Sequence, residues 1–257
     1  MHHLWLTASV LATSAFVMAC GGGGGGSTPA PTPLASAEGF YQGTVSTGTQ
    51  FQLLALENDQ FYSLVGNTDA QGVFRVVSLV EGKGLSSSAS FSASNVKEYQ
   101  ASGQVFTGTL SASYNPKTSI SGSVSSASGV TTFSGTAPTT GTSNYLYDSP
   151  ASLSLIAGSW TGTTLYNESL NFSISSSGGL SGVSALGCSF SGTVSPRVSG
   201  KNVLDVSVTF GPAPCALAGQ KATGIAVSYL LTSGKRQLLV AATDIARSAG
   251  TVVFAQR

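Results

Sequence analysis

Residues 39–44 read GFYQGT, and residues 158–163 read GSWTGT. In both segments an aromatic residue follows one glycine by two positions and precedes another glycine by two positions. A second matching pair, GVTTF at residues 129–133 and GTVVF at residues 250–254, lies near the end of each half of the chain. The members of each pair are separated by about 120 residues, which indicates a duplicated unit of that size.

From residue 40 onward, short runs of alternating apolar and polar residues are separated by Gly, Asn, Asp, Ser and Pro. Residues 203–210 (VLDVSVTF), for example, place Leu204, Val206 and Val208 on one face and polar residues on the other. This alternation is typical of strands with one buried face, so the chain is predicted to be all-β. The other runs of this kind are residues 51–57, 105–114, 120–124, 170–175, 225–231 and 237–243.

Pairing of the Gly-aromatic strand with the Gly-x-x-x-Phe strand of the same half would bring the first and last strands of that half together. Closure of a barrel requires such a pairing. We therefore expect two similar antiparallel β-barrels of about eight strands each, formed by residues 38–143 and residues 144–257. The alternative is a tandem β-sandwich in which Trp160 is an ordinary core residue.

Residues 147–157 (YDSPASLSLIA) are the one helical candidate of the chain. Asp148 can cap a helix, Pro150 suits its first turn, and Gly158 can end it. A helical turn that runs into Gly-x-Trp resembles the start of the first strand in lipocalin-like barrels. The resemblance implies that Trp160 packs across the base of the second barrel.

Tyr41 occupies the position in the first half that matches Trp160 in the second. We expect both residues to be structural aromatics at the start of their barrels. Arg247 or Arg257, near the last strand, is expected to lie over the Trp160 ring. In layout, the chain resembles surface lipoproteins with tandem barrels, such as those of the transferrin-binding type.

Residues 4–17 form an apolar run that is too short to span a bilayer of roughly 30 Å as a helix, and such a run is typical of a targeting signal. The run closes on Val-Met-Ala-Cys at residues 17–20, which resembles the lipobox of bacterial lipoproteins, and six glycines follow. The resemblance implies that residues 1–19 are removed, that Cys20 carries a diacylglycerol, and that the protein is sorted to the outer membrane. Residues 20–37 form a Gly/Pro-rich tether. An ordinary cleaved secretory signal is the alternative.

The chain has three cysteines. If Cys20 carries lipid, Cys188 and Cys215 remain as a pair, and an oxidising compartment favours a disulfide between them. Such a bridge would stabilise the fold by roughly 3 to 4 kcal/mol in the chain-entropy model. Two buried free thiols, which would suit a cytosolic protein, are the alternative.

Only 8% of the residues are charged, but the charges are unevenly distributed. Residues 38–148 contain seven acidic and four basic residues, a net charge of −3, whereas residues 149–257 contain three acidic and seven basic residues, a net charge of +4. The asymmetry could help the two halves dock, or could steer the second half toward an anionic surface. The bases form no stripe, so no nucleic-acid partner is expected.

The sequence lacks the residues that most catalytic and metal sites require. Its two histidines, His2 and His3, lie in the predicted signal, which excludes histidine catalysis and histidine metal sites in the processed chain. Oxidised cysteines would provide neither a nucleophile nor zinc ligands. Ser94 and Lys97 have the spacing of a Ser-x-x-Lys motif but lack its partner motifs. No catalytic residue, metal or cofactor is therefore predicted.

Carboxylates are the remaining candidates for chemistry. Glu57 and Asp59 flank a turn and could bind calcium or act as a glycosidase pair. Asp205 and Asp244 stand on predicted strands whose polar face is expected to face solvent. Turn formation and outward charge explain these four residues more simply, so the chain is not expected to be an enzyme.

We therefore expect an outer-membrane lipoprotein, anchored through Cys20, that acts in binding or adhesion, with a protein or a small apolar molecule as its partner. Residues 82–90 and 211–221 are expected to be loops or sheet edges that could serve recognition. A structural subunit of an envelope assembly is the second hypothesis, and a carboxylate-dependent hydrolase is the third. A sizeable apolar cavity would favour a small ligand, whereas packed cores with an exposed apolar loop patch would favour a protein partner.

Overall fold

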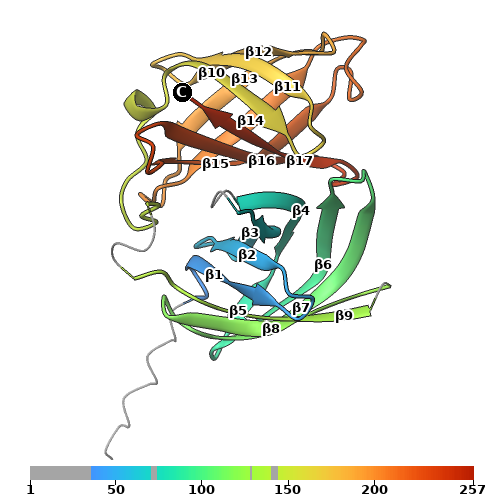
Figure 1. Ribbon diagram of the computed structural model, residues 1–257, viewed down its shortest axis with the longest axis vertical. Coiled ribbons are helices and arrows are strands. Elements are labelled where there is room, and N and C mark those ends of the chain that lie inside the picture. Colours follow the sequence, from blue (N-terminus) through green and yellow to red (C-terminus); the bar gives the residue numbers. More distant parts are fainter. Residues whose placement is uncertain (1–35, 71–73, 128, 140–143) are drawn as a thin grey trace, which may run out of the picture. The chain divides into compact units, whose positions relative to one another are not determined.

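The computed structural model describes residues 36–70, 74–127, 129–139 and 144–257 (Figure 1). The predicted all-β class is confirmed, and the described residues form two closed antiparallel barrels. The tandem sandwich is wrong because each sheet closes into a ring. In each half of the chain the first strand pairs with the last. No helix among the described residues has the length and apolar character needed to cross a bilayer.

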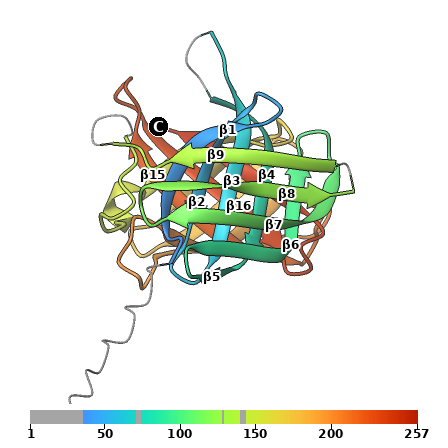
Figure 2. The ribbon, with the colours of Figure 1, turned by 90° about the horizontal axis from the view of Figure 1, so that it is seen from below.

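The first barrel is a ring of eight strands, and a ninth short strand, β5, pairs only with β6. Figure 2 shows β9, β8, β7 and β6 of this ring side by side. The strands are β1 (Gly39–Val45), β2 (Gln50–Ala55), β3 (Gln60–Thr68), β4 (Phe74–Lys83), β5 (Leu85–Ser87), β6 (Ser90–Gln100), β7 (Val105–Asn115), β8 (Ser119–Ser126) and β9 (Gly129–Thr136).

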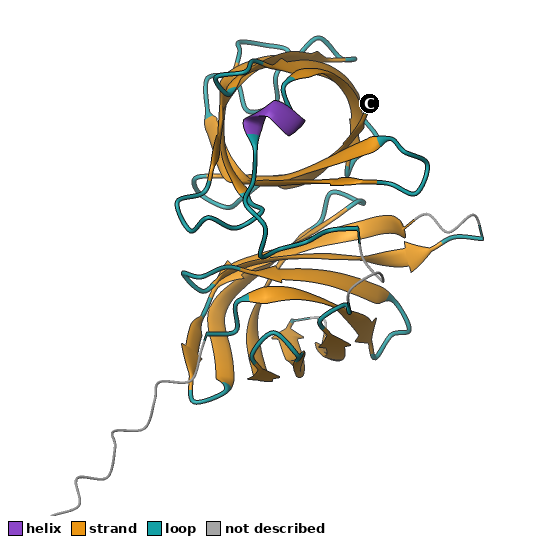
Figure 3. Cartoon of the chain, turned by 90° about the vertical axis from the view of Figure 1, so that its left-hand side faces the viewer, coloured by secondary structure: helices purple, strands orange, loops and turns teal. Residues whose placement is uncertain are grey.

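The second barrel is also a ring of eight strands, preceded by one 3₁₀ turn, η1 (Leu153–Leu155). Its strands follow one another around the ring in chain order, as an up-and-down barrel requires. Figure 3 shows this ring from its end. They are β10 (Gly158–Thr164), β11 (Ser169–Ile174), β12 (Gly179–Ser184), β13 (Ser189–Pro196), β14 (Leu204–Phe210), β15 (Lys221–Leu230), β16 (Arg236–Asp244) and β17 (Gly250–Gln256).

Both barrels close through the strands that the sequence repeat predicted to pair. β1 pairs with β9 so that Gly43 lies opposite Gly135, and β10 pairs with β17 so that Gly162 lies opposite Ala255. The two registers differ by one residue, since Phe133 lies opposite Val45 whereas Phe254 lies opposite Thr163, and in both seams the small residues allow the backbones to approach closely. The repeated segments are therefore the closing strands of two copies of one architecture.

The matching aromatics make the same hydrogen bond in both copies. The Tyr41 hydroxyl donates to the carbonyl of Ala37 at 3.1 Å, and the Trp160 indole N–H donates to the carbonyl of Ile156 at 2.7 Å. In each case the acceptor lies four residues earlier in the chain. Both side chains are buried, with 0% and 2% of their surface exposed. The bond ties the segment that enters each barrel to the aromatic residue inside it.

The interior of the first barrel is packed with aromatic side chains. Phe51 meets Phe133 edge to face with 5.7 Å between ring centroids, and Phe61 meets Phe91 in the same way at 5.8 Å. Such geometry is the favoured one for aromatic pairs. The other buried members of this core are Ala37, Tyr41, Leu53, Ala93, Val96, Leu110, Ala112, Tyr114 and Ile120.

A third apolar cluster joins the outer faces of the two barrels. On β15, Ile225 belongs to this cluster whereas its neighbour Ala226 belongs to the interior of the second barrel, as the alternation of a strand requires. The buried members of the joining cluster are Leu54, Leu56, Leu79 and Tyr99 of the first barrel, Tyr145 and Tyr147 of the connection, and Leu165, Val203, Ile225, Ala241 and Val252 of the second barrel.

Ion pairs flank this cluster, and they have the signs that the charge asymmetry predicted. Arg197 Nε lies 2.7 Å from Glu57 Oε1, and Arg247 Nε lies 2.8 Å from Glu81 Oε1. Each pair joins a base of the second half to an acid of the first. Arg247 also donates to the carbonyl of Asn95 at 2.8 Å.

Tyr99 of the first barrel packs against the turn between β16 and β17. Its hydroxyl lies 3.2 Å from Glu81 Oε1 and 3.0 Å from the carbonyl of Arg247. Burial and the neighbouring Glu81 carboxylate raise the pKa of Tyr99, so the hydroxyl keeps its proton. A Cβ at Gly250 would lie 2.8 Å from the Tyr99 ring, which explains why a glycine begins β17.

Of two local predictions, one was wrong and the other was met by a strand at a sheet edge. The helix expected at residues 147–157 is reduced to η1, because Asp148 does not cap it and instead binds Lys117 and Lys201 at 2.6 and 2.7 Å. Residues 82–90, expected as a loop or a sheet edge, contain the end of β4, the start of β6 and between them β5, an edge strand that pairs only with β6. The alternation of apolar and polar residues in β5 covers only three residues, which is too short to be recognised in a serine-rich stretch.

We predict that Tyr41→Phe lowers the free energy of unfolding by about 1–3 kcal/mol, measured by urea denaturation. The change removes the donor to Ala37 and also the acceptor that the backbone N–H of Lys117 uses at 3.2 Å. Tyr62→Phe is the matched control, because the Tyr62 hydroxyl has no hydrogen-bond partner in the described part of the chain. Equal losses in the two variants would show that the shared hydrogen bond contributes nothing specific.

Candidate functional site

The second barrel directs alternate side chains of every strand toward its axis. On β11, Leu170, Phe172 and Ile174 are buried while the residues between them are exposed. On β14, Leu204, Val206 and Val208 are buried and the residues between them are partly buried. Because all strands of the ring do this, the axis is surrounded by apolar side chains.

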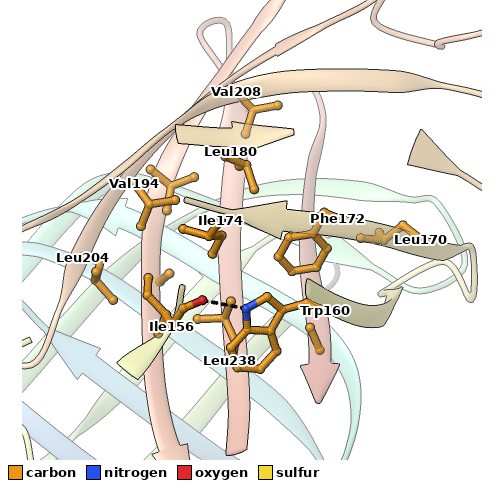
Figure 4. Packing of buried hydrophobic residues seen from close by; sticks show 13 residues of the cluster. Ile156, Trp160, Leu170, Phe172, Ile174, Leu180, Val194, Leu204, Val208 and Leu238 are labelled. Atoms are coloured by element: carbon orange, nitrogen blue, oxygen red, sulfur yellow. Dashed lines mark hydrogen bonds between the residues drawn. The ribbon is translucent and has the colours of Figure 1, made fainter. Parts of the chain in front are cut away.

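Trp160 closes one end of this axis. Its ring is stacked on Phe172 of the neighbouring strand, with 6.5 Å between centroids and an interplanar angle of 11°. Figure 4 shows the indole N–H directed at the carbonyl of Ile156, next to Phe172 and Leu238. The turn η1 lies across the same end of the ring (Figure 3).

Arg257 covers the outer side of this closed end. Its guanidinium carbon lies 4.6 Å from the centroid of the Trp160 ring, within range of a cation–π contact. The same guanidinium donates to the carbonyl of Leu155 at 2.8 Å and to that of Ala157. A Cβ at Gly158, whose φ is 122°, would lie 2.5 Å from this group. A glycine is therefore required where the chain passes from η1 into β10.

A cavity of about 380 Å³ occupies the barrel beyond Trp160. Its walls are mainly aliphatic and aromatic, and include Leu180, Phe190, Val208 and Leu238. This volume lies in the range of small-molecule sites, roughly 300–1,000 Å³. The cavity exists because inward positions of adjacent strands carry small residues, namely Ala222, Ala226 and Ala242.

The mouth of the cavity lies at the opposite end from Trp160, where the turns after β10, β12, β14 and β16 meet. Cys188 and Cys215 form a disulfide there, with 4.5 Å between their Cα atoms. The bridge ties the loop at residues 211–220 to the turn between β12 and β13. Pro214 and Leu217 of this loop line the cavity, so the predicted loop contributes directly to the site.

Two carboxylates line the cavity, Glu168 and Asp244. The expectation that Asp244 faces solvent is wrong, because its side chain continues the inward row of β16 and the residue is only 4% exposed. The carboxylate accepts from the Ala249 N–H at 2.7 Å and from the Ser248 hydroxyl at 2.8 Å. Glu168 was missed in the sequence, although it continues the inward row of Leu170 by one step toward the mouth.

The other carboxylates singled out in the sequence have structural partners. Glu57 and Asp205 both bind Arg197, at 2.7 and 2.5 Å. Asp59 accepts from the backbone N–H of Ser86 at 3.1 Å and from its hydroxyl at 2.6 Å. Within the described ranges, no three His, Cys, Asp or Glu side chains are grouped so that they could hold a metal ion.

The remaining candidates from the sequence are distributed as follows. Arg247 binds Glu81 and does not lie over Trp160, a position that Arg257 takes. Lys97 of the Ser-x-x-Lys spacing donates its amine to the Thr107 hydroxyl at 2.7 Å, and Ser94 lies at a bulge of β6. Cys20 lies outside the described residues.

A second hollow of about 360 Å³ lies between the outer faces of β1–β3 and β15–β17. Its lining mixes the tyrosines Tyr62, Tyr145 and Tyr229 with the amides of Gln42 and Gln52. Burial raises the pKa of all three tyrosines, so their hydroxyls are neutral. The hollow is more polar than the cavity of the second barrel and lies in the joint between the barrels.

No protein-family model and no curated protein sequence matches this chain. Similar solved structures include transferrin binding protein B from serogroup B Neisseria meningitidis, at 10% identity and a TM-score of 0.26, and a mutant of that protein from Haemophilus parasuis, at 10% identity and a TM-score of 0.27. Each match covers 82% of this chain and only 66% of the other. A candidate outer membrane protein from Bacteroides fragilis matches at 12% identity and a TM-score of 0.24, over 85% of this chain and 94% of that one.

We predict that the double variant Cys188→Ala, Cys215→Ala loses about 3–4 kcal/mol of unfolding free energy, measured by urea denaturation under oxidising conditions. The reason is that the bridge restricts a loop with a sequence separation of 27 residues in the unfolded chain. The wild-type protein treated with reductant provides the control and should show the same loss. Titratable free thiols in the native exported protein would contradict the disulfide.

Proposed function

We propose that this protein is a lipid-anchored binding protein of the outer membrane, and that its second barrel holds a small apolar molecule. The apolar cavity beyond Trp160 is the observation that carries the proposal. The floor of Trp160, Ile156 and Arg257 closes one end, so a ligand enters and leaves at the mouth.

The physical drive for binding is removal of apolar surface from water. Each Å² of such surface contributes about 25 cal/mol when it is buried. The walls formed by Phe172, Leu180 and Val206 offer this contact on all sides of a bound molecule, whereas the hydroxyls at the mouth are already used by turns. Shape and apolar area would therefore determine most of the affinity.

The first barrel supports the second in this proposal. Its interior is packed with the rings of Phe51, Phe61 and Phe91, and its outer face holds the turn of Arg247, which also contributes to the mouth of the cavity. The domain division at residues 38–143 and 144–257 thus separates a support from a binding unit.

The anchor part of the proposal depends on the sequence at residues 17–20. Lipid on Cys20 and the tether at residues 20–37 would hold both barrels at the membrane, after removal of residues 1–19. Three acyl chains would bury enough methylenes for stable attachment, at about 0.8 kcal/mol each. Location at the outer membrane then follows from the lipoprotein resemblance.

Capture of a protein partner at the mouth is the second candidate function. Leu186 and Ile245, on two turns of the mouth, are 74% and 77% exposed, and Tyr166 on a third turn is 42% exposed. Exposed apolar groups that gather around one opening favour an interaction there. The two candidates differ in their occupant, since a partner protein would cover the mouth without filling the cavity.

We predict saturable binding of the fluorescent apolar probe N-phenylnaphthylamine to the chain without residues 1–19, and a loss of affinity of about tenfold or more in Ala222→Phe. Ala222 faces the cavity between Val208 and Asp244, so a phenyl ring there would occupy ligand volume. Thr223→Phe, on the exposed side of the same strand, is the matched control and should bind normally. The proposal is wrong if the wild-type protein does not bind the probe, or if both variants bind it as well as the wild type does.

We also predict that metabolic palmitate labels the wild-type protein in Gram-negative cells and does not label Cys20→Ser. The thiol is the only group at residues 17–20 that can form the thioether to diacylglycerol. The variant should be exported but should leave the membrane fraction. Equal labelling of the two proteins would overturn the proposed anchor.

A further inference from the structure

The charged side chains at the mouth of the cavity in the second barrel are all acidic. The described residues that line the cavity include two carboxylates, Glu168 and Asp244, and no Lys, Arg or His. Both carboxylates continue inward rows of apolar residues, on β11 and on β16, by one step toward the opening. A molecule in the cavity would therefore have its apolar part against the walls and its outer end near two acids.

Asp244 remains an anion in this position. Burial raises the pKa of Asp244, but the hydrogen bonds from Ala249 and Ser248 outweigh burial, and the net pKa lies below the usual range. The carboxylate closes the turn between β16 and β17, which makes it a fixed negative charge at the mouth. Its field acts on any ligand group that lies nearby.

Glu168 is the acid that is free to bind a ligand. Its backbone N–H donates to the Thr164 hydroxyl at 3.1 Å, which fixes the residue at the turn between β10 and β11. Its carboxylate makes no hydrogen bond or ion pair within the part of the chain that the structure describes. The side chain is partly buried and lines the cavity two residues from Leu170. A partly desolvated carboxylate without a partner favours a cationic donor.

The two bases that lie next to Asp244, on the same turn and on the paired strand, do not neutralise this charge. Arg247, on the same turn as Asp244, is paired with Glu81 at 2.8 Å and with the carbonyl of Asn95. Lys221 precedes the inward-facing Ala222 by one residue and is exposed on the opposite side of β15. The mouth therefore has a net negative potential toward the cavity.

We infer that the cavity selects an amphiphile with an apolar body and a cationic amine head, and that it rejects a fatty acid of the same length. This inference rests on the proposed function and names the class of ligand for that site. An ammonium group at the mouth donates a charge-assisted hydrogen bond to the Glu168 carboxylate and is attracted by the Asp244 anion. A ligand carboxylate at the same place meets two like charges and finds no cationic side chain in the lining.

The test is competition for bound N-phenylnaphthylamine by dodecylamine, dodecanol and dodecanoate, each below its critical micelle concentration and near neutral pH. The three chains are equal in length, so differences report the head group. We expect dodecylamine to compete at least tenfold better than dodecanoate, with dodecanol between them, and the difference should shrink as salt is added.

Glu168→Gln should lower the affinity for dodecylamine several-fold, raise the affinity for dodecanoate, and leave the affinity for dodecanol unchanged. Glu98→Gln, which removes one carboxylate from the first barrel, is the matched control for net charge and should change none of the three. Dodecanoate that competes as well as dodecylamine, or unchanged head-group preference in Glu168→Gln, overturns the inference while the cavity remains a binding site. Failure of the probe itself to bind overturns the proposed function and the inference together.

Discussion

Closure of each sheet by its first and last strands is the constraint on which the rest of the structure depends. The paired registers of Gly43 with Gly135 and of Gly162 with Ala255 remove the free edges and define an inside. Once an inside exists, the aromatic at the third position of the first strand must lie in it. The hydrogen bond from Trp160 to the carbonyl of Ile156 then draws the preceding segment across the end of the barrel.

The two copies use this frame differently because the volumes of their inward residues differ. Phe51, Phe61 and Phe91 fill the first barrel, whereas the alanines at positions 222 and 226 leave space in the second. The outer faces of the two barrels are complementary in charge, since Arg247 of the second barrel binds Glu81 of the first. Aromatic rings therefore fill the first barrel while the second is hollow, and the turn that contacts the first barrel lies at the rim of the cavity.

Alternation and the repeat were sufficient to predict the strands, their closure and the place of Trp160, because these depend on periodicity and local spacing. The cavity could not be predicted, because it depends on the summed volume of all side chains that point into the barrel and on which face of β15 points inward. Asp244 was assigned to the solvent face for a related reason. Its hydrogen bonds to Ser248 and Ala249 allow a carboxylate to continue an apolar row, and alternation alone does not reveal them. Glu168 could have been found by extending the row of Leu170, Phe172 and Ile174 by one step.

The same two carboxylates bear on the choice between binding and hydrolysis. A glycosidase needs one acid whose pKa is raised, so that it is protonated when it meets the leaving group. Asp244 has the opposite property, since its hydrogen bonds lower its pKa and its oxygens are engaged in a turn. The hydroxyl of Thr164 is used by the backbone of Glu168, and the deeper walls are aliphatic, so the site offers few groups that could orient a sugar. An apolar cavity with a fixed anion at its mouth is suited to holding an amphiphile by its chain and selecting it by its head.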